Sequence, residues 1–502
     1  MVRTTGGDVR GVTAEGVTSF RGIPYGADTG GAARFLPPKT PDPWTGTLHA
    51  DAYGADAVQS RGPRPKAGAT TNNFDLPPGE DCLRLNVWTP SADDAKRPVM
   101  VWLHGGGFYS GSASGSMYEG ANLARRGDVV VVSINHRLGA LGFLHLAYLT
   151  DAPDSVNVGM LDIVLALEWV RDNVAAFGGD PGNVTLFGES GGGRKVTTLL
   201  AMPAAQGLFH KGVIQSGPAV FMNTVDGVTR LGEFMLDRLG IHSDVLESLQ
   251  ALPADTIVEA QKQAIAHFGR GAPGLSQVFA PVADGRILPG QPFDPEAPAI
   301  SDTIPIIAGY NETEWTLFMG RDPDLGELTE QGLEARLEQE DIAAETLAAY
   351  RAHYPHATPS DLLAFILTGR SRYPIDTLVL AARKAARNAA PVFLYTLTYR
   401  TPAGRGTLRT PHGLEIPFVF DNVAVSSRFV GEGDAPKAMA DQMSEAWIAF
   451  ARTGNPGHAG IPEWPAYEAA DRSTMVFDQT SRLVSDFGAN ERAVWHEHFY
   501  SA

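Results

Sequence analysis

A glycine-flanked serine constrains this chain more than any other feature. Gly188-Glu189-Ser190-Gly191-Gly192 is the only Gly-x-Ser-x-Gly in its 502 residues. An apolar, β-branched run at residues 183–187 precedes it, and a helix-like segment follows it. A strand that enters a helix through such a serine predicts a nucleophile elbow, because the glycines permit the strained turn that lifts the hydroxyl above the sheet edge. We therefore predict a nucleophile at Ser190; the alternative is a simple strand-to-helix turn.

Strand-like and helix-like segments alternate along most of the chain. Apolar strand-like runs lie at residues 98–103, 129–134, 184–187, 212–215, 304–308 and 392–396. Helical patterns between several of them predict an α/β fold with a mostly parallel sheet covered on both faces. Residues 8–25 predict a hairpin at the sheet edge. We expect one domain over residues 1–502, in which helical insertions at about 221–300 and 312–390 roof the site.

Composition and charge exclude several classes of partner. The chain has 40 Lys and Arg against 57 Asp and Glu, a formal net charge of −17, which argues against binding nucleic acid or an anionic membrane surface. No apolar run approaches the roughly 18 residues of a membrane span. Cys82 is the only cysteine, so no internal disulfide can form. The polar residues 1–10 contain no secretory signal, so we expect a cytoplasmic protein; secretion is the alternative if a signal has been removed.

A nucleophilic serine needs a base, and the base needs an acid that orients it. In enzymes with a nucleophile elbow, the chain order is serine, acid, histidine. His412 lies in a loop beyond the strand that ends near residue 400, where a base can reach Ser190. The loop after the preceding strand offers Glu312 and Glu314, which spacing alone does not separate.

A second glycine motif predicts backbone donors for an oxyanion. His104-Gly105-Gly106-Gly107-Phe108 follows a strand, and bare glycines let backbone N–H groups point at a reacting oxygen. We expect donors at Gly106, Gly107 and Gly191; the alternative is a tight turn used for packing.

This chemistry needs no cofactor. We expect no metal site at His496-Glu497-His498, because histidines two apart on a helix point to different faces.

Motifs along nearly the whole chain point to one family. Besides the serine and glycine motifs, they are Phe20-Arg21-Gly22-Ile23-Pro24-Tyr25, Arg34-Phe35, Glu80-Asp81-Cys82-Leu83-Arg84-Leu85-Asn86-Val87-Trp88, Asn135-His136-Arg137-Leu138-Gly139, Gln215-Ser216-Gly217 and residues 412–420. With them the chain resembles the type-B carboxylesterases, a family that includes cholinesterases and bacterial para-nitrobenzyl esterases. The resemblance implies an α/β-hydrolase fold and a serine carboxylesterase for small to medium, fairly apolar esters.

The resemblance also assigns residues that spacing leaves open. It implies Glu314 as the acid, because the family places its acid at the fifth residue after the strand-ending glycine, here Gly309. It further implies two structural ion pairs and two residues beside the triad: Arg34–Glu80, Arg137–Asp162, Glu189 and Ser216.

Several positions depart from the family pattern. Gly191 replaces the usual alanine, which is expected to loosen the turn and keep its N–H. Trp315 stands where glycine is common and is expected to narrow the pocket. The loop between Ala57 and Cys82 contains no tryptophan, so we do not expect a preference for choline esters.

Candidate substrate-pocket residues follow from residue type and from the resemblance. The aromatic candidates are equally compatible with core positions, and Leu275 and Gln277 fall where relatives shape the acyl pocket. The full set is Phe108, Tyr109, Tyr118, Phe221, Leu275, Gln277, Trp315 and Arg194.

Arg194 and Lys195 replace small or apolar residues of the family within the first turns of the helix that starts at Ser190. Cations there oppose the helix dipole, at a few tenths to about 1 kcal/mol each. One hypothesis is that a positive group faces the pocket and favours esters whose acyl part carries a carboxylate. The simpler interpretation is that both side chains point away and pair with acidic neighbours.

Two other functions compete with the esterase prediction. The same triad could hydrolyse an amide or a carbamate, so the alternative enzyme is an amidase or carbamate hydrolase. A non-catalytic interaction module is the alternative of another class, since this fold has such relatives. Those relatives typically lose a triad member, whereas Ser190, Glu314 and His412 are all present here.

Overall fold

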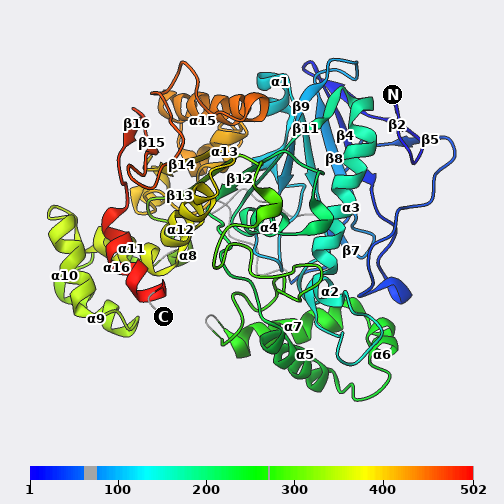
Figure 1. Cartoon of the computed structure of the whole chain (residues 1–502), viewed down its shortest axis with the longest axis horizontal. Helices are drawn as coiled ribbons and strands as arrows, with labels where there is room; N and C mark the ends of the chain where they lie inside the picture. Colours follow the sequence, from blue (N-terminus) through cyan, green and yellow to red (C-terminus); the bar gives the residue numbers. More distant parts are fainter. Residues whose placement is uncertain (61–75, 270–271, 321, 501–502) are drawn as a thin grey trace.

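A large sheet runs through the centre of the molecule (Figure 1). The computed structural model describes residues 1–60, 76–269, 272–320 and 322–500, and among these residues the sheet has 11 strands. In spatial order they are β16 (Arg482–Val484), β15 (Thr474–Phe477), β14 (Val392–Leu397), β13 (Ile306–Asn311), β12 (Lys211–Gln215), β11 (Gly179–Glu189), β9 (Arg97–Leu103), β10 (Val130–Ile134), β8 (Arg84–Thr89), β4 (Val17–Pro24) and β3 (Val12–Ala14).

The sheet is parallel in its centre and antiparallel at its edges. From β15 to β10 each strand runs parallel to its neighbours, whereas β16, β8, β4 and β3 are antiparallel additions. This arrangement confirms the predicted α/β fold. The predicted edge hairpin is formed by β3 and β4, but β2 (Asp8–Arg10) belongs to a separate small sheet. The remaining strands are β1 (Val2–Arg3), β5 (Thr47–His49), β6 (Asp56–Ala57) and β7 (Pro78–Gly79).

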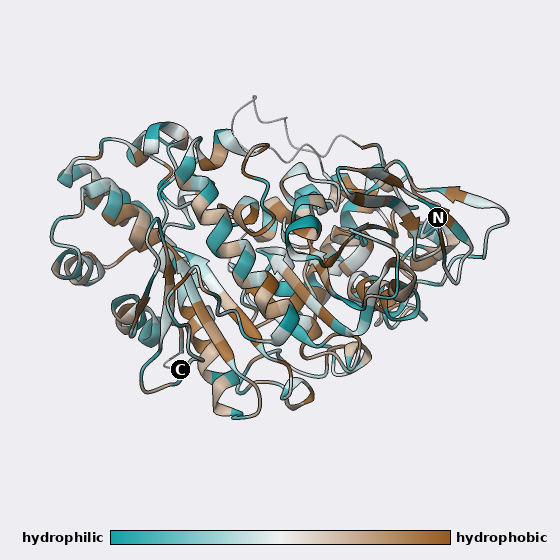
Figure 2. Cartoon of the chain, turned by 90° about the horizontal axis from the view of Figure 1, so that it is seen from above, coloured by the Kyte–Doolittle hydropathy of each residue, from teal (hydrophilic) through white to brown (hydrophobic). Residues whose placement is uncertain are grey.

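Side chains of the central strands fill two cores, because successive side chains of a strand point to opposite faces. In β9, Val99, Val101 and Leu103 join the core that includes helix α3 (Val158–Asn173), and Met100 and Trp102 join the core that includes helix α15 (Asp434–Thr453). Figure 2 shows the apolar strands between helices that carry polar residues. Burial on both faces explains why these strands appear as continuous apolar runs in the sequence.

Helices cover the sheet and occupy the connections between its strands. Besides α3 and α15, the α-helices are α1 (Ala121–Gly127), α2 (Gly139–Phe143), α4 (Gly191–Leu199), α5 (Val225–Leu239), α6 (Val245–Ala251), α7 (Ala254–Phe268), α8 (Thr316–Met319), α9 (Glu330–Gln339), α10 (Ala344–His353), α11 (Pro359–Arg370), α12 (Tyr373–Ala386), α13 (Ile416–Val419), α14 (Ser427–Val430) and α16 (Ala489–Tyr500).

Two long helical connections contain the segments predicted as insertions, 221–300 and 312–390. The first joins β12 to β13 and the second joins β13 to β14, so each leaves the carboxyl edge of the parallel sheet, where β11 ends beside Ser190. The last helix of the second connection, α12, contacts β13 and β14 and therefore covers the sheet. Residues 270, 271 and 321 of these connections lie outside the described residues.

Both ion pairs implied by the family resemblance are present and largely buried. Arg137 Nη2 lies 2.6 Å from Asp162 Oδ1, and the backbone N–H of Arg137 donates to Oδ2 of the same carboxylate at 2.9 Å. Arg34 Nε lies 2.6 Å from Glu80 Oε1, and its Nη1 donates to the carbonyl of Leu249 at the end of α6. The first pair attaches the loop after β10 to helix α3, and Arg34 connects Glu80 to helix α6.

Removal of the Asp162 charge is expected to destabilise the fold strongly. The side chains of Arg137 and Asp162 are only 3% and 0% exposed, so Asp162→Asn leaves a buried guanidinium without its counterion. We expect the free energy of unfolding, measured by urea denaturation, to fall by about 3–5 kcal/mol. The control is Asp172→Asn, because the Arg171–Asp172 pair is 51% and 46% exposed, and its loss is expected to cost less than about 1 kcal/mol. Equal effects of the two variants would contradict this assignment.

Candidate active site

Ser190 lies at the turn between β11 and α4. Its backbone has φ 58° and ψ −120°, a strained conformation for a residue with a side chain. Two hydrogen bonds hold the turn: the N–H of Ser190 donates to the carbonyl of Gln215 at 2.8 Å, and the N–H of Arg194 donates to the carbonyl of Ser190 at 3.0 Å. The serine is half-buried. The sequence-predicted elbow geometry is thus present.

His412 contacts the carboxylate of Glu314. Its Nδ1 lies 2.6 Å from Oε2 of Glu314, a side chain with no exposed surface. The other oxygen, Oε1, accepts a hydrogen bond from the backbone N–H of Asn311 at 2.7 Å. Glu312, the competing candidate, has no ion pair or hydrogen bond to His412 among the described residues, and burial raises the pKa of its carboxyl to about 7. The geometry therefore favours Glu314 as the partner of the imidazole.

The other ring nitrogen of His412 faces Glu189. Nε2 lies 3.0 Å from Oε1 of Glu189, and no hydrogen bond between Ser190 and His412 is found within the described part of the chain. Burial alone would lower the pKa of His412, but the charges of Glu189, Tyr373 and Glu314 raise this pKa well above its ordinary value. Burial in turn raises the pKa of Glu189 to about 8. The imidazole thus lies between two buried carboxyl groups.

Glu415 is a third buried carboxyl in this cluster, and the sequence analysis missed it. Asn311 Nδ2 donates to its Oε2 at 2.7 Å, and Gln215 Nε2 donates to its Oε1 at 3.2 Å. Burial and the charge of Glu314 raise the pKa of Glu415. Its signal in the sequence was an acidic residue three positions after His412, at the start of an apolar run.

The glycine loop lies against the serine turn. Gly106 and Gly107 have φ of +84° and +65°, and a Cβ on Gly106 would lie 2.4 Å from the carbonyl oxygen of Ser110. A Cβ on Gly191 would lie 2.1 Å from the carbonyl oxygen of Gly107. The absence of a methyl group at Gly191 therefore lets the glycine loop approach closely; the expected loosening of the turn stays a prediction.

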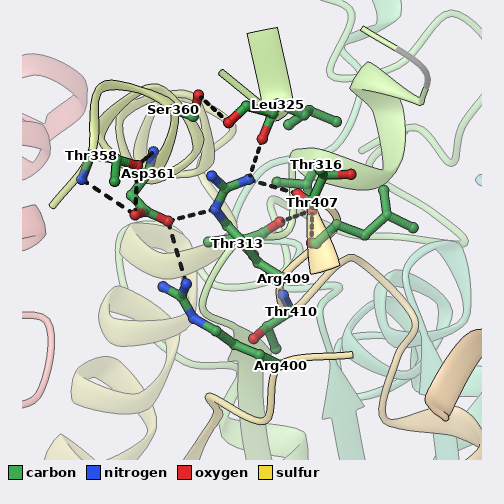
Figure 3. A network of polar contacts seen from close by, with 12 residues as sticks. Thr313, Thr316, Leu325, Thr358, Ser360, Asp361, Arg400, Thr407, Arg409 and Thr410 are labelled. Carbon is green, nitrogen blue, oxygen red and sulfur yellow. Dashed lines mark hydrogen bonds and ion pairs between the residues drawn. The ribbon is translucent and has the colours of Figure 1, made fainter. Parts of the chain in front are cut away.

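A polar network connects the loops that carry the acid and the base (Figure 3). Arg409 Nε donates to Asp361 Oδ1 at 2.6 Å, which attaches the loop before His412 to helix α11. The N–H of Thr410 donates to Oγ1 of Thr313 at 2.9 Å. Because Thr313 precedes the acid directly and Thr410 lies two residues before the base, this bond fixes the two loops relative to each other.

Two aromatic rings that the sequence analysis did not select lie on His412. The ring of Tyr373, at the start of α12, is centred 4.9 Å from the imidazole, and that of Phe318, on α8, is centred 5.2 Å from it. Trp315 reaches this group through Phe318, at 5.1 Å between rings. Phe318 follows Trp315 by three residues, a helical spacing that could have indicated it. Tyr373 comes from a distant segment and gave no local signal.

The other candidate pocket residues lie either in apolar clusters or against the glycine loop. Phe108 and Tyr118 are 0% and 3% exposed and pack in the two main cores, which favours the core alternative for both. Leu275 belongs to a small apolar cluster with Val156 and Val228. Tyr109 and Gln277 lie against the glycine loop, since a Cβ on Gly107 would meet both side chains within 3.1 Å.

Phe221, a candidate pocket residue, and Ser216, expected beside the triad, lie in different surroundings. Phe221 stacks on Tyr500 at 5.9 Å, and the guanidinium of Arg372 lies 5.6 Å from its ring centre. Ser216 is fully buried, with φ 48°, and its N–H donates to the carbonyl of Gly309 at 2.8 Å. That bond connects the end of β12 to β13, the strand that leads to the acid.

Arg194 and Lys195 point to different surroundings. Lys195 is fully buried; its Nζ donates to the carbonyl of His104 at 2.8 Å and lies 5.6 Å from the ring centre of Phe108. Neither Arg194 nor Lys195 forms an ion pair with a carboxylate among the described residues. The interpretation that both pair with acidic neighbours is therefore wrong.

Comparisons with known proteins identify the family. A sequence model described as the carboxylesterase family matches residues 1–495. The chain belongs to the carboxylesterase family. It is 36% identical to the para-nitrobenzyl esterase of Bacillus subtilis (98% of this chain, 97% of that protein) and 35% identical to the phenmedipham hydrolase of Pseudarthrobacter oxydans (97% of each). The carboxylesterase structure of Geobacillus stearothermophilus matches with 37% identity and a TM-score of 0.83, covering 98% of this chain and 99% of that one.

This carboxylesterase is accordingly a serine hydrolase of carboxylic esters with an α/β-hydrolase fold. The family and the esterases among its relatives do not favour the amidase, carbamate hydrolase or non-catalytic alternatives. Its substrates are small-molecule esters. Within the described residues, no helix has the length and apolar character needed to cross a membrane.

A methyl group at position 191 is expected to displace the glycine loop. The Cβ of Gly191→Ala would overlap the Gly107 carbonyl, so backbone donors must move, and loss of one oxyanion donor costs about 10²–10³-fold in kcat. We expect kcat for a neutral ester to fall by at least about tenfold, measured by steady-state kinetics. Gly290→Ala is the control, because a Cβ there meets nothing within 4 Å. An unchanged kcat in Gly191→Ala would show that the loop adapts without cost.

Proposed function

We propose that three side chains carry the carboxylesterase reaction: Ser190 as nucleophile, His412 as base and Glu314 as the acid that orients the base. The observation that supports this most is the 2.6 Å contact between His412 Nδ1 and Glu314 Oε2, together with the 3.0 Å contact between His412 Nε2 and Glu189, the residue before the strained serine. A carboxylate at Nδ1 keeps the proton on that nitrogen and leaves Nε2 without one, as acceptance of the serine proton requires.

The proposed reaction has two symmetric halves. Ser190 Oγ attacks the ester carbonyl while His412 takes the hydroxyl proton and then donates it to the leaving alcohol. Water repeats the sequence on the acyl-enzyme, with His412 again as base, and releases the acid. The N–H groups of Gly106, Gly107 and Gly191 bind the oxyanion in each half, where charge develops in the transition state. No cofactor takes part in these steps.

Glu189 and Ser216 act on the triad indirectly in this proposal. The carboxylate of Glu189 lies 3.0 Å from His412 Nε2, where it stabilises the imidazolium that forms during each half of the reaction. Ser216 fixes the backbone between β12 and β13 through its bond to Gly309.

The proposed substrates are small to medium, fairly apolar esters. Tyr373, Phe318 and Trp315 form an aromatic group at His412, which suits an aromatic or branched apolar part of the ester. The relative named para-nitrobenzyl esterase is consistent with such a preference. Tyr109, Gln277 and Phe221 are proposed as further walls of the site.

We propose that residues 1–502 act as one catalytic domain, with the connections at about 221–300 and 312–390 above the site, except for α12, which covers the sheet. We also propose that the protein works in the cytoplasm, where thiols stay reduced. Its single cysteine, Cys82, is a buried free thiol, and burial raises the pKa of that thiol far above the ordinary value. No extracellular cross-link is therefore needed to explain its position.

Ser190→Ala is the direct test of the proposed triad. We expect the rate on a para-nitrophenyl ester to fall by about 10⁴-fold or more, because the remaining groups cannot form an acyl-enzyme. An organophosphate should label Ser190 in the native enzyme, with the modified peptide identified by mass spectrometry. The matched control is Glu312→Gln, which alters a nearby carboxyl outside the triad and should retain most activity. Turnover by Ser190→Ala, or labelling elsewhere, would overturn the proposal.

The pH dependence of kcat/KM should show the effect of the Glu189 charge on the pKa of His412. His412 must be neutral to accept a proton, so kcat/KM rises with pH through its pKa. Since the charge of Glu189 raises that pKa, Glu189→Gln should lower it and move the acid limb of the profile to lower pH. Glu312→Gln again serves as control, and its acid limb should lie at the same pH as in the native enzyme. A limb that stays unchanged or moves to higher pH in Glu189→Gln would refute this role.

A further inference from the structure

Arg194 is a cation without a counterion beside the serine turn. It lies in the first turn of α4, and its N–H donates to the carbonyl of Ser190. The residue is half-buried, and its Nε is fully buried without a hydrogen-bond partner. No ion pair to Arg194 is found in residues 1–60, 76–269, 272–320 and 322–500. By contrast, Arg126, which is also half-buried, contacts three carboxylates, so acidic partners are abundant in this chain.

The neighbouring charges do not neutralise Arg194. Asp376 is the nearby acid, but it is already paired with Arg372 at 3.0 Å and accepts a hydrogen bond from the hydroxyl of Tyr500 at 2.6 Å. Burial lowers the pKa of Arg194; Tyr373 and Asp376 act to raise it, and the positive charge of Arg372 acts to lower it. A guanidinium nevertheless stays protonated at physiological pH. The group of Arg194, Arg372 and Asp376 therefore keeps one net positive charge.

This charge lies four residues after the proposed nucleophile and near a residue that contacts the proposed base. Tyr373, whose hydroxyl acts electrostatically on Arg194, has its ring centred 4.9 Å from the imidazole of His412, in a tilted arrangement. Tyr373 thus touches both the proposed base and the surroundings of the guanidinium. A partly desolvated guanidinium next to reacting groups binds a carboxylate through charge-assisted, bidentate hydrogen bonds that are stronger than those at the surface.

We propose that Arg194 binds a free carboxylate carried by the ester substrate, so that the enzyme prefers esters with a second, ionised carboxyl group. This inference rests on the proposed function, because it requires the ester to react at Ser190. The carboxylate can belong to the acyl part or to the alcohol part, and the two arms of the experiment distinguish these sources.

The experiment compares matched ester pairs. The acyl arm uses mono-para-nitrophenyl adipate against para-nitrophenyl hexanoate, and the alcohol arm uses para-acetoxybenzoate against para-acetoxybenzamide. For each pair, the ratio of kcat/KM for the charged ester to that for the neutral ester is measured in the native enzyme, Arg194→Gln, Arg194→Lys and Arg428→Gln. Arg428→Gln is the control, since it removes the same charge from an exposed position on α14.

We expect the ratio for one pair to fall by at least about tenfold in Arg194→Gln, to recover partly in Arg194→Lys and to stay unchanged in Arg428→Gln. The pair that responds identifies the part of the ester that carries the carboxylate. Equal losses on charged and neutral esters in both arms, or an effect of Arg428→Gln as large as that of Arg194→Gln, would overturn the inference. Hydrolysis of the neutral esters that persists in Ser190→Ala would instead overturn the proposed function, so the two failures are separable.

Discussion

The contact between His412 and Glu314 is the interaction on which the rest of the site depends. The carboxylate is fully buried and held by the N–H of Asn311, so its charge acts on the imidazole with little screening. Glu189 places a second carboxyl on the opposite side of the same ring. A histidine between two buried carboxyls gains a proton easily, which stabilises the imidazolium of each proposed step and raises the pH at which the base becomes neutral.

Such a contact needs loops that do not move apart. The acid and the base come from the ends of two parallel strands, β13 and β14, and neither loop has regular structure to fix it. The bond between Thr410 and Thr313 and the anchoring of Arg409 on Asp361 supply that rigidity. The buried pair Arg137–Asp162 has the same function at another irregular loop. Side-chain hydrogen bonds and ion pairs thus hold the segments that the hydrogen bonds of the sheet do not reach.

The sequence could predict every element whose signal is local. The Gly-flanked serine, the glycine loop and the apolar strands depend on neighbouring residues, and the observed elbow and parallel sheet agree with them. Glu314 and Glu312 could not be separated by spacing, because both lie in one loop; only the direction of the chain after Asn311 brings one carboxylate to the imidazole. Tyr373, Phe318 and Glu415 were missed since their contacts join segments distant in the sequence.

What the sequence determined by itself was the order of strands and helices, the family and the chemical groups available for an acyl transfer, because residue type and periodicity encode these directly. The tertiary structure decided which groups meet. It closed the glycine loop onto Gly191, where a methyl group would overlap the Gly107 carbonyl, turned Lys195 toward the His104 carbonyl and left Arg194 without an acidic partner near Tyr373. Such distances depend on how whole loops pack against each other, and no local pattern in the sequence records that packing.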